Sequence, residues 1–142
     1  MWLKYILKKY VESVTVNTQL RSGGKILVEQ IVRLNTDLAF FVPGESYLEV
    51  LNSMYDKKKE LKLINARHEA GAANMAEAYG KLTGKPGVAF VTRGPGACHA
   101  SIGVHIAYQD STPMILFIGQ VSTEAIGLSL IHISEPTRPL YI

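Results

Sequence analysis

Short apolar runs alternate along the chain with segments whose apolar residues recur at the helical period. Four mainly apolar runs lie at residues 38–42, 61–64, 88–92 and 114–118, and such runs are typical of parallel strands covered on both faces. Helical segments follow Gly24, begin at Glu45, and occupy residues 70–82 and about 97–108. This alternation predicts an α/β domain, an open parallel sheet with helices on both faces.

The composition fits one globular domain with an ordinary core. Of the 142 residues, 47% are hydrophobic and 19% are charged, which excludes a disordered chain. The net charge of +3 does not predict nucleic-acid binding, because acidic residues are interleaved and Lys57–Lys59 precedes Glu60. No apolar run reaches the length of about 18 residues that spans a membrane. A single cysteine, Cys98, argues against a disulfide framework or zinc cluster and favours a cytoplasmic location.

Both ends of the chain differ from its middle. Residues 1–21 carry no motif and lack the continuous apolar stretch of a signal peptide, so we interpret them as an extension of doubtful origin. The domain is predicted to cover residues 22–122, with a tail over residues 123–142. Residues 128–138 are encoded residue for residue by the end of a sequencing-library adaptor, so we interpret the tail from Leu128 onward as non-native and exclude His132 from the candidate residues.

Glu69 is the first candidate functional residue. It stands where the run 61–64 gives way to an alanine-rich helix, at the sheet edge where α/β proteins bind ligands. Small residues follow it from Ala70 to Ala73, and burial there would favour the neutral carboxyl, which can share a proton with a ligand nitrogen. The alternative is a first-turn glutamate that only stabilises its helix through the helix dipole.

A second candidate is the turn Gly94-Pro95-Gly96, which is expected to lead from the third strand into the next helix. Its glycines allow close backbone approach to a ligand, but His99 replaces the third glycine of a dinucleotide fingerprint. A plain strand-to-helix turn is an equal alternative. Cys98 and His99 are adjacent on a helix and therefore do not face each other, and we expect Cys98 to be buried and inert.

Four motifs stand in a fixed order along the chain: Val42-Pro43-Gly44, Arg67-His68-Glu69, Gly94-Pro95-Gly96 with His99, and Asp110-Ser111-Thr112-Pro113 running on to Gly119-Gln120. Over residues 23–121 this set resembles the N-terminal pyrimidine-binding domain of thiamine diphosphate enzymes of the acetolactate synthase, pyruvate oxidase and benzoylformate decarboxylase superfamily. The resemblance implies a single domain of the thiamine diphosphate-binding fold. It departs from the family pattern at Cys98-His99, where Thr-Asn is usual, and this leaves the substrate class open.

The resemblance also implies roles for individual residues. Glu69 matches the catalytic glutamate that hydrogen-bonds the cofactor's aminopyrimidine nitrogen and so promotes ylid formation, which is followed by decarboxylation or carboligation of 2-oxo acids. The remaining residues that match cofactor-binding positions are Pro43, Gly44, Thr92, Gly94, Pro95, Gly96 and His99. No metal ligand is predicted in this chain.

Other parts of the site are expected outside this chain. In the family, a separate domain holds the diphosphate and its Mg²⁺ through a Gly-Asp-Gly motif, and this sequence has none. FAD is compatible with the resemblance, although no residue here supports it. A second subunit is expected to complete the site, as a homodimer or homotetramer, so the fragment alone should be inactive. The alternatives are a Rossmann-like nucleotide-binding module and a non-catalytic dimerisation domain.

Overall fold

A computed structural model describes residues 20–126 of the chain. The predictions for residues 1–19 and 127–142, including the tail that we interpreted as non-native and His132, lie outside the described residues. The strands are β1 (Leu38–Phe41), β2 (Lys62–Asn65), β3 (Gly87–Thr92) and β4 (Met114–Gly119). The helices are α2 (Gly23–Arg33), α3 (Leu48–Asp56), α4 (Glu69–Thr83) and α5 (Arg93–Gln109), with short 3₁₀ turns η1 (Glu45–Tyr47) and η2 (Thr123–Ala125).

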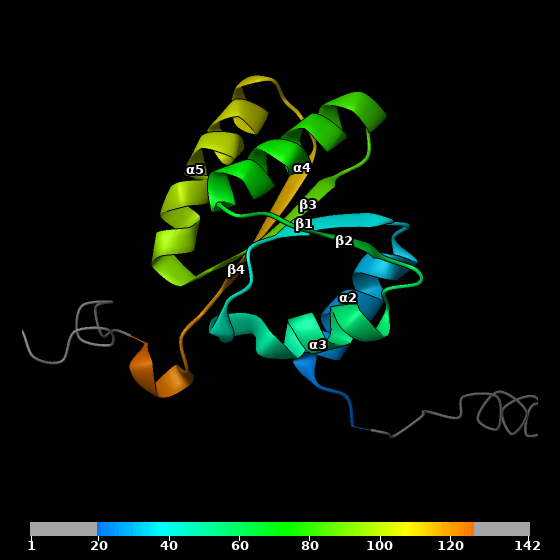
Figure 1. The fold of residues 1–142 in the computed structure, drawn as a ribbon, viewed down its shortest axis with the longest axis vertical. Helices are drawn as coiled ribbons and strands as arrows, with labels where there is room; N and C mark the ends of the chain where they lie inside the picture. The colour runs from blue at the N-terminus through cyan, green and yellow to red at the C-terminus, as the bar shows by residue number, and fades with distance from the viewer. Residues whose placement is uncertain (1–19, 127–142) are drawn as a thin grey trace, which may run out of the picture.

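The four strands form one parallel sheet in the order β2-β1-β3-β4. Helices α4 and α5 cover one face of this sheet, and α2 and α3 cover the other (Figure 1). The predicted α/β class, with an open parallel sheet between two helical layers, is therefore confirmed. Each strand begins and ends within one residue of the predicted run, because buried parallel strands read as continuous apolar segments between turns.

The helix ends follow local capping chemistry. The Ser22 hydroxyl accepts a hydrogen bond from the Lys25 amide at 3.2 Å, which starts α2 as predicted. Helix α4 ends at Gly84, whose φ of 69° is the left-handed conformation that glycine adopts without strain.

The start of α5 corrects one prediction. Gly94-Pro95-Gly96 forms the first turn of α5 and not a loop before it. Proline fits there because the amides of a first helical turn have no intrahelical partner, so the missing N–H costs nothing.

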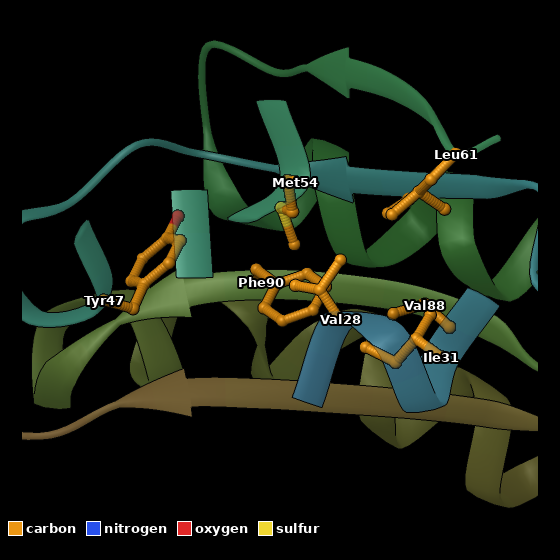
Figure 2. Close-up of a cluster of buried hydrophobic side chains, with 8 residues drawn as sticks. Val28, Ile31, Tyr47, Met54, Leu61, Val88 and Phe90 are labelled. Carbon is orange, nitrogen blue, oxygen red and sulfur yellow. The ribbon is translucent and has the colours of Figure 1, made fainter. Parts of the chain in front are cut away.

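The large side chains of the core lie between the sheet and the pair α2 and α3. Figure 2 shows this cluster, in which Phe90 of β3 packs among side chains from both helices. Its buried members are Val28, Ile31, Ala39, Tyr47, Met54, Leu61, Val88 and Phe90. Leu48, the first residue of α3, lies outside this cluster and is 57% exposed.

Small residues dominate the opposite face. Ala72, Ala73 and Ala76 of α4 are fully buried, and they pack against Ala89 and Val91 of β3 and Ala100 of α5. A Cβ added to Gly87 would lie 1.8 Å from the Ala76 carbonyl oxygen, so the backbones of β3 and α4 are in direct contact. This close packing holds α4, whose first residue is Glu69, against the sheet.

Candidate functional site

The candidate site lies at the carboxyl edge of the sheet, between β1 and β3. Strand β2 lies on one side of β1, and β3 lies on the other. The direction in which strands are added to the sheet therefore reverses between β1 and β3. Such a reversal opens the crevice where α/β proteins bind ligands. Pro43 and Gly44 follow β1 at this point, and Arg93 and Gly94 follow β3.

Glu69 and His99 come together across 30 residues of sequence. The Nδ1 atom of His99 lies 2.9 Å from Oε2 of Glu69, within hydrogen-bond distance. The Glu69 side chain is only 14% exposed, whereas that of His99 is 53% exposed. Glu69 is the first residue of α4, and His99 lies in the second turn of α5, so two packed helices hold the pair.

His68 completes this group. Its Nδ1 atom accepts a hydrogen bond from the Ala70 amide at 3.2 Å, which caps α4. Its ring stacks on that of His99, with centroids 4.6 Å apart and planes inclined by 29°. The carboxylate of Glu69 is thus flanked by two imidazole rings.

The protonation of Glu69 differs from the sequence expectation. Burial raises the pKa of Glu69, but a backbone hydrogen bond at Glu69 and the hydrogen bond and charge of His99 lower it more. The pKa of Glu69 is therefore below its ordinary value of 4.5, and the charged form is favoured. The expectation of a carboxyl neutralised by burial is wrong for this chain, because it counted desolvation without the hydrogen bonds.

Pro43 and Gly44 lie against the end of β3. A Cβ added to Gly44 would lie 2.4 Å from Cβ of Thr92, so only glycine permits this approach. The Thr92 hydroxyl lies 2.8 Å from that of Ser46, in a hydrogen bond that ties the two strand exits together. The structure therefore brings three of the predicted cofactor-binding residues to one place.

The first turn of α5 presents a more open surface. Gly94 and Pro95 are exposed, and a Cβ on Gly94 would meet nothing within 4 Å, whereas Gly96 is buried against Val91. Arg93 has a φ of 37° and forms an ion pair with Glu45. A cavity of about 420 Å³ adjoins this turn. Its lining residues are Glu45, Ser46, Arg93, Gln120, Val121, Ser122 and Ala125.

The sequence analysis did not identify Tyr47 of this region, and it placed Cys98 in the interior. Tyr47 is buried, donates its hydroxyl proton to the Val42 carbonyl, and has its pKa raised to about 12 by burial and by the charge of Glu69. Its position three residues after Gly44 was the available signal. Cys98 was expected to be buried but is exposed. The expectation failed because α5 carries small apolar residues on several sides, so the sequence does not show which side faces inward.

The comparisons with known proteins agree with this arrangement. Residues 21–137 match the family described as "Thiamine pyrophosphate enzyme, N-terminal TPP binding domain". The chain belongs to this family. The matched residues include the described domain and extend beyond residue 127, where the tail begins that we interpreted as adaptor-derived.

Several relatives in this family are acetolactate synthases. The chain is 42% identical over 106 residues to the mitochondrial catalytic subunit of Saccharomyces cerevisiae, with 75% of the chain and 15% of the relative covered. It is 39% identical over 106 residues to the large subunit of Lactococcus lactis, with 75% and 18% covered. For the large subunit of Buchnera aphidicola from Acyrthosiphon pisum, the identity is 36% over 127 residues, with 83% and 22% covered. The chain thus spans between 15% and 22% of the length of these relatives.

The described residues fit the pyrimidine half of thiamine diphosphate. The charged, mostly buried carboxylate of Glu69 can accept a hydrogen bond from a protonated ring nitrogen. Its Oε1 atom remains available for this contact while Oε2 is hydrogen-bonded to His99. The glycine turn at Pro43-Gly44 brings backbone close to this crevice. Within residues 20–126, no helix is long and apolar enough to cross a membrane.

Proposed function

We propose that this chain forms the pyrimidine-binding part of an acetolactate synthase-like enzyme that acts on 2-oxo acids. The observation that carries the proposal is Glu69, a shielded carboxylate held beside the reversal point of the sheet in a chain of the thiamine diphosphate family. The names of the relatives supply the reaction class, acetolactate synthesis.

Glu69 is proposed as the catalytic residue. Thiamine diphosphate, when bound, supplies an electron sink for the carbanion formed on decarboxylation of a 2-oxo acid. Glu69 would hold a proton at the pyrimidine ring nitrogen, and the low exposure of its side chain would keep water from competing for that contact. His99, already bonded to Oε2, would orient the carboxylate so that Oε1 faces the ring.

The other predicted residues would shape the pocket around the ring. Pro43, Gly44 and Thr92 would form one wall, and Gly94, Pro95 and Gly96 would form the floor at the start of α5. Mg²⁺ and the diphosphate would bind to a domain outside this chain, and FAD remains a prediction for the full-length enzyme only. The pairing of two subunits and a cytoplasmic location also stay predictions, since relatives include a mitochondrial enzyme as well as bacterial ones.

Of the two alternatives, the nucleotide-binding module has less support. Gly94 and Gly96 lie inside a helical turn, so there is no glycine-rich loop before the helix in this part of the chain. The residues directly after β4 begin with Gln120, where a dinucleotide site uses an acidic residue. Dimerisation without catalysis is tested by the molar mass of the purified chain in solution.

Substitution of Glu69 tests the proposed role directly. In the full-length enzyme, Glu69→Gln should remove nearly all turnover, because the neutral amide cannot hold the ring proton. Glu49→Gln is the matched control, since Glu49 also lies in a first helical turn but in α3, on the other face of the sheet. Near-normal turnover in the Glu69→Gln enzyme would refute the assignment, provided its circular dichroism matches the wild type.

The isolated chain offers a second test. It should bind thiamine diphosphate only weakly, because the charged half of the cofactor has no partner here. Titration with thiamine, followed by NMR, should shift the His99 signals in the wild type and in Glu49→Gln but not in Glu69→Gln. Tight, Mg²⁺-dependent binding of thiamine diphosphate in calorimetry would contradict the division of the site between domains.

A further inference from the structure

We propose that His68, Glu69 and His99 bind a first-row transition metal ion such as Zn²⁺ when the pyrimidine crevice is empty. One ligand atom from each of these three residues lies within 4.8 Å of the other two. Within the described residues 20–126, this is the group of three histidine, cysteine or acidic side chains placed closely enough to hold a metal ion. No metal ligand was predicted from the sequence, in which 30 residues separate the two histidines. The packing of α4 on α5 brings them together.

The donor set suits zinc and its neighbours in the first transition row. Two imidazoles and one carboxylate, with a fourth position open to water, form a common zinc site in proteins. Metal–ligand distances of about 2.0–2.1 Å in a tetrahedron place neighbouring ligand atoms about 3.3 Å apart, and His99 Nδ1 and Glu69 Oε2 already lie at 2.9 Å. Mg²⁺ prefers oxygen ligands in octahedral geometry and should not compete here.

The ligand side chains can reach this geometry by small rotations. His68 and His99 are exposed, and their backbones are fixed at the starts of two packed helices. Nδ1 of His68 accepts a hydrogen bond from the Ala70 amide, which leaves Nε2 of the same ring available as a metal ligand. A metal ion lies in the plane of each imidazole that binds it, so one ring must turn out of the present stack.

Two features weaken the site without removing it. The start of α4 carries the positive end of the helix dipole, which disfavours a cation nearby. Turning one ring also forfeits the contact between His68 and His99. We therefore expect reversible binding in the micromolar range and not the tight binding of a structural zinc site. Because the ion uses Glu69, it should compete with thiamine, a consequence that rests on the proposed function.

Metal titration of the 142-residue chain tests the proposal. Calorimetry with Zn²⁺ should show one equivalent bound, and Co²⁺ should give visible bands without a thiolate charge-transfer band. His68→Asn, His99→Asn and Glu69→Gln should each weaken binding at least about tenfold. Asparagine at position 68 can still cap α4, so that variant should fold, as circular dichroism would verify.

The remaining histidines and the cysteine provide matched controls. His105 is exposed on α5, and His132 lies outside the described residues. His105→Asn, His132→Asn and Cys98→Ser should bind Zn²⁺ as the wild type does. Wild-type affinity in His68→Asn and His99→Asn, or an equal loss in any control, would mean an adventitious ion only. These outcomes do not depend on thiamine, so the metal proposal can fail while the proposed function stands.

Discussion

The two faces of the sheet are built from side chains of different size. Strand β3 shows this within a few residues, because Val88 and Phe90 point toward α2 and α3, whereas Gly87 and Ala89 point toward α4. The first face buries branched and aromatic side chains between the layers. The second brings α4 so close that its backbone touches β3.

This difference separates stability from the geometry of the site. Burial of large apolar side chains supplies most of the stabilising free energy, so the α2 and α3 face should dominate the stability of the domain. Close backbone contact fixes the positions of α4 and α5, and Glu69, His68 and His99 all lie at the starts of these helices. Substitutions on the two faces should therefore have different consequences.

The largest predicted effect is on the face with the large side chains. Phe90 is 2% exposed, and its ring stacks on Phe117 at 4.7 Å and on Tyr47 at 6.2 Å. Phe90→Ala should lower the free energy of unfolding by about 3–5 kcal/mol, from lost burial and the cavity that remains. Urea denaturation measures this loss. A decrease of less than about 1 kcal/mol would show that this face does not dominate stability.

A smaller effect on stability, with a larger effect on geometry, is predicted where α5 contacts α4. A Cβ added to Gly103 would lie 2.6 Å from Cβ and 2.7 Å from the carbonyl carbon of Ala73. Gly103→Ala gains about 1 kcal/mol of helix propensity, but the clash costs about 1–3 kcal/mol. We expect a net loss of about 1 kcal/mol, together with altered NMR signals of His99 as the helices separate.

Gly71→Ala is the matched control for this substitution. Gly71 also lies within a helix, α4, and a Cβ there meets nothing within 4 Å. The same change should therefore leave stability unchanged or raise it by up to about 1 kcal/mol. If the two alanine variants behaved alike, the close contact between α4 and α5 would not be what positions His99.

Much of this fold could be predicted because its signals are local. Each strand is a continuous apolar run that ends in Gly, Pro or polar residues, and Ser22 and Gly84 mark helix ends through their own backbone chemistry. The inward sides of the helices were less evident. Cys98 was expected to be buried and is exposed, because the local sequence does not fix which side of α5 faces the sheet.

The candidate site could be predicted only in part, for a related reason. Glu69 was recognised from its place at a strand exit, which sequence order alone reveals. Its contact with His99 depends on how α4 packs against α5, and no pattern in the sequence encodes that distance. The pKa of Glu69 was expected to rise, because burial can be inferred from the neighbouring residues in the sequence. The hydrogen bond with the distant His99, which helps to lower that pKa, cannot be inferred in this way.

The smallest predicted effect concerns pH and the charge of Glu69. Because the pKa of Glu69 is lowered in the folded chain, its charged form contributes stability above its ordinary pKa of 4.5. That contribution should be lost as the pH falls through the lower folded-state pKa. The pKa of Asp37 is also lowered, by the Tyr79 hydroxyl that donates to it at 2.5 Å, so the wild-type profile alone cannot identify Glu69.

A difference measurement isolates the Glu69 contribution. The free energy of unfolding of the wild type minus that of Glu69→Gln should shrink as the pH is lowered from neutral to below 4.5, while Asp37 contributes equally to both proteins. In the His99→Asn background the same difference should decrease by less and level off at a higher pH, because one of the interactions that lower the pKa of Glu69 is removed. A difference that grows on acidification would instead mean that burial outweighs the hydrogen bonds, and the small-residue face would then hold a neutral carboxyl.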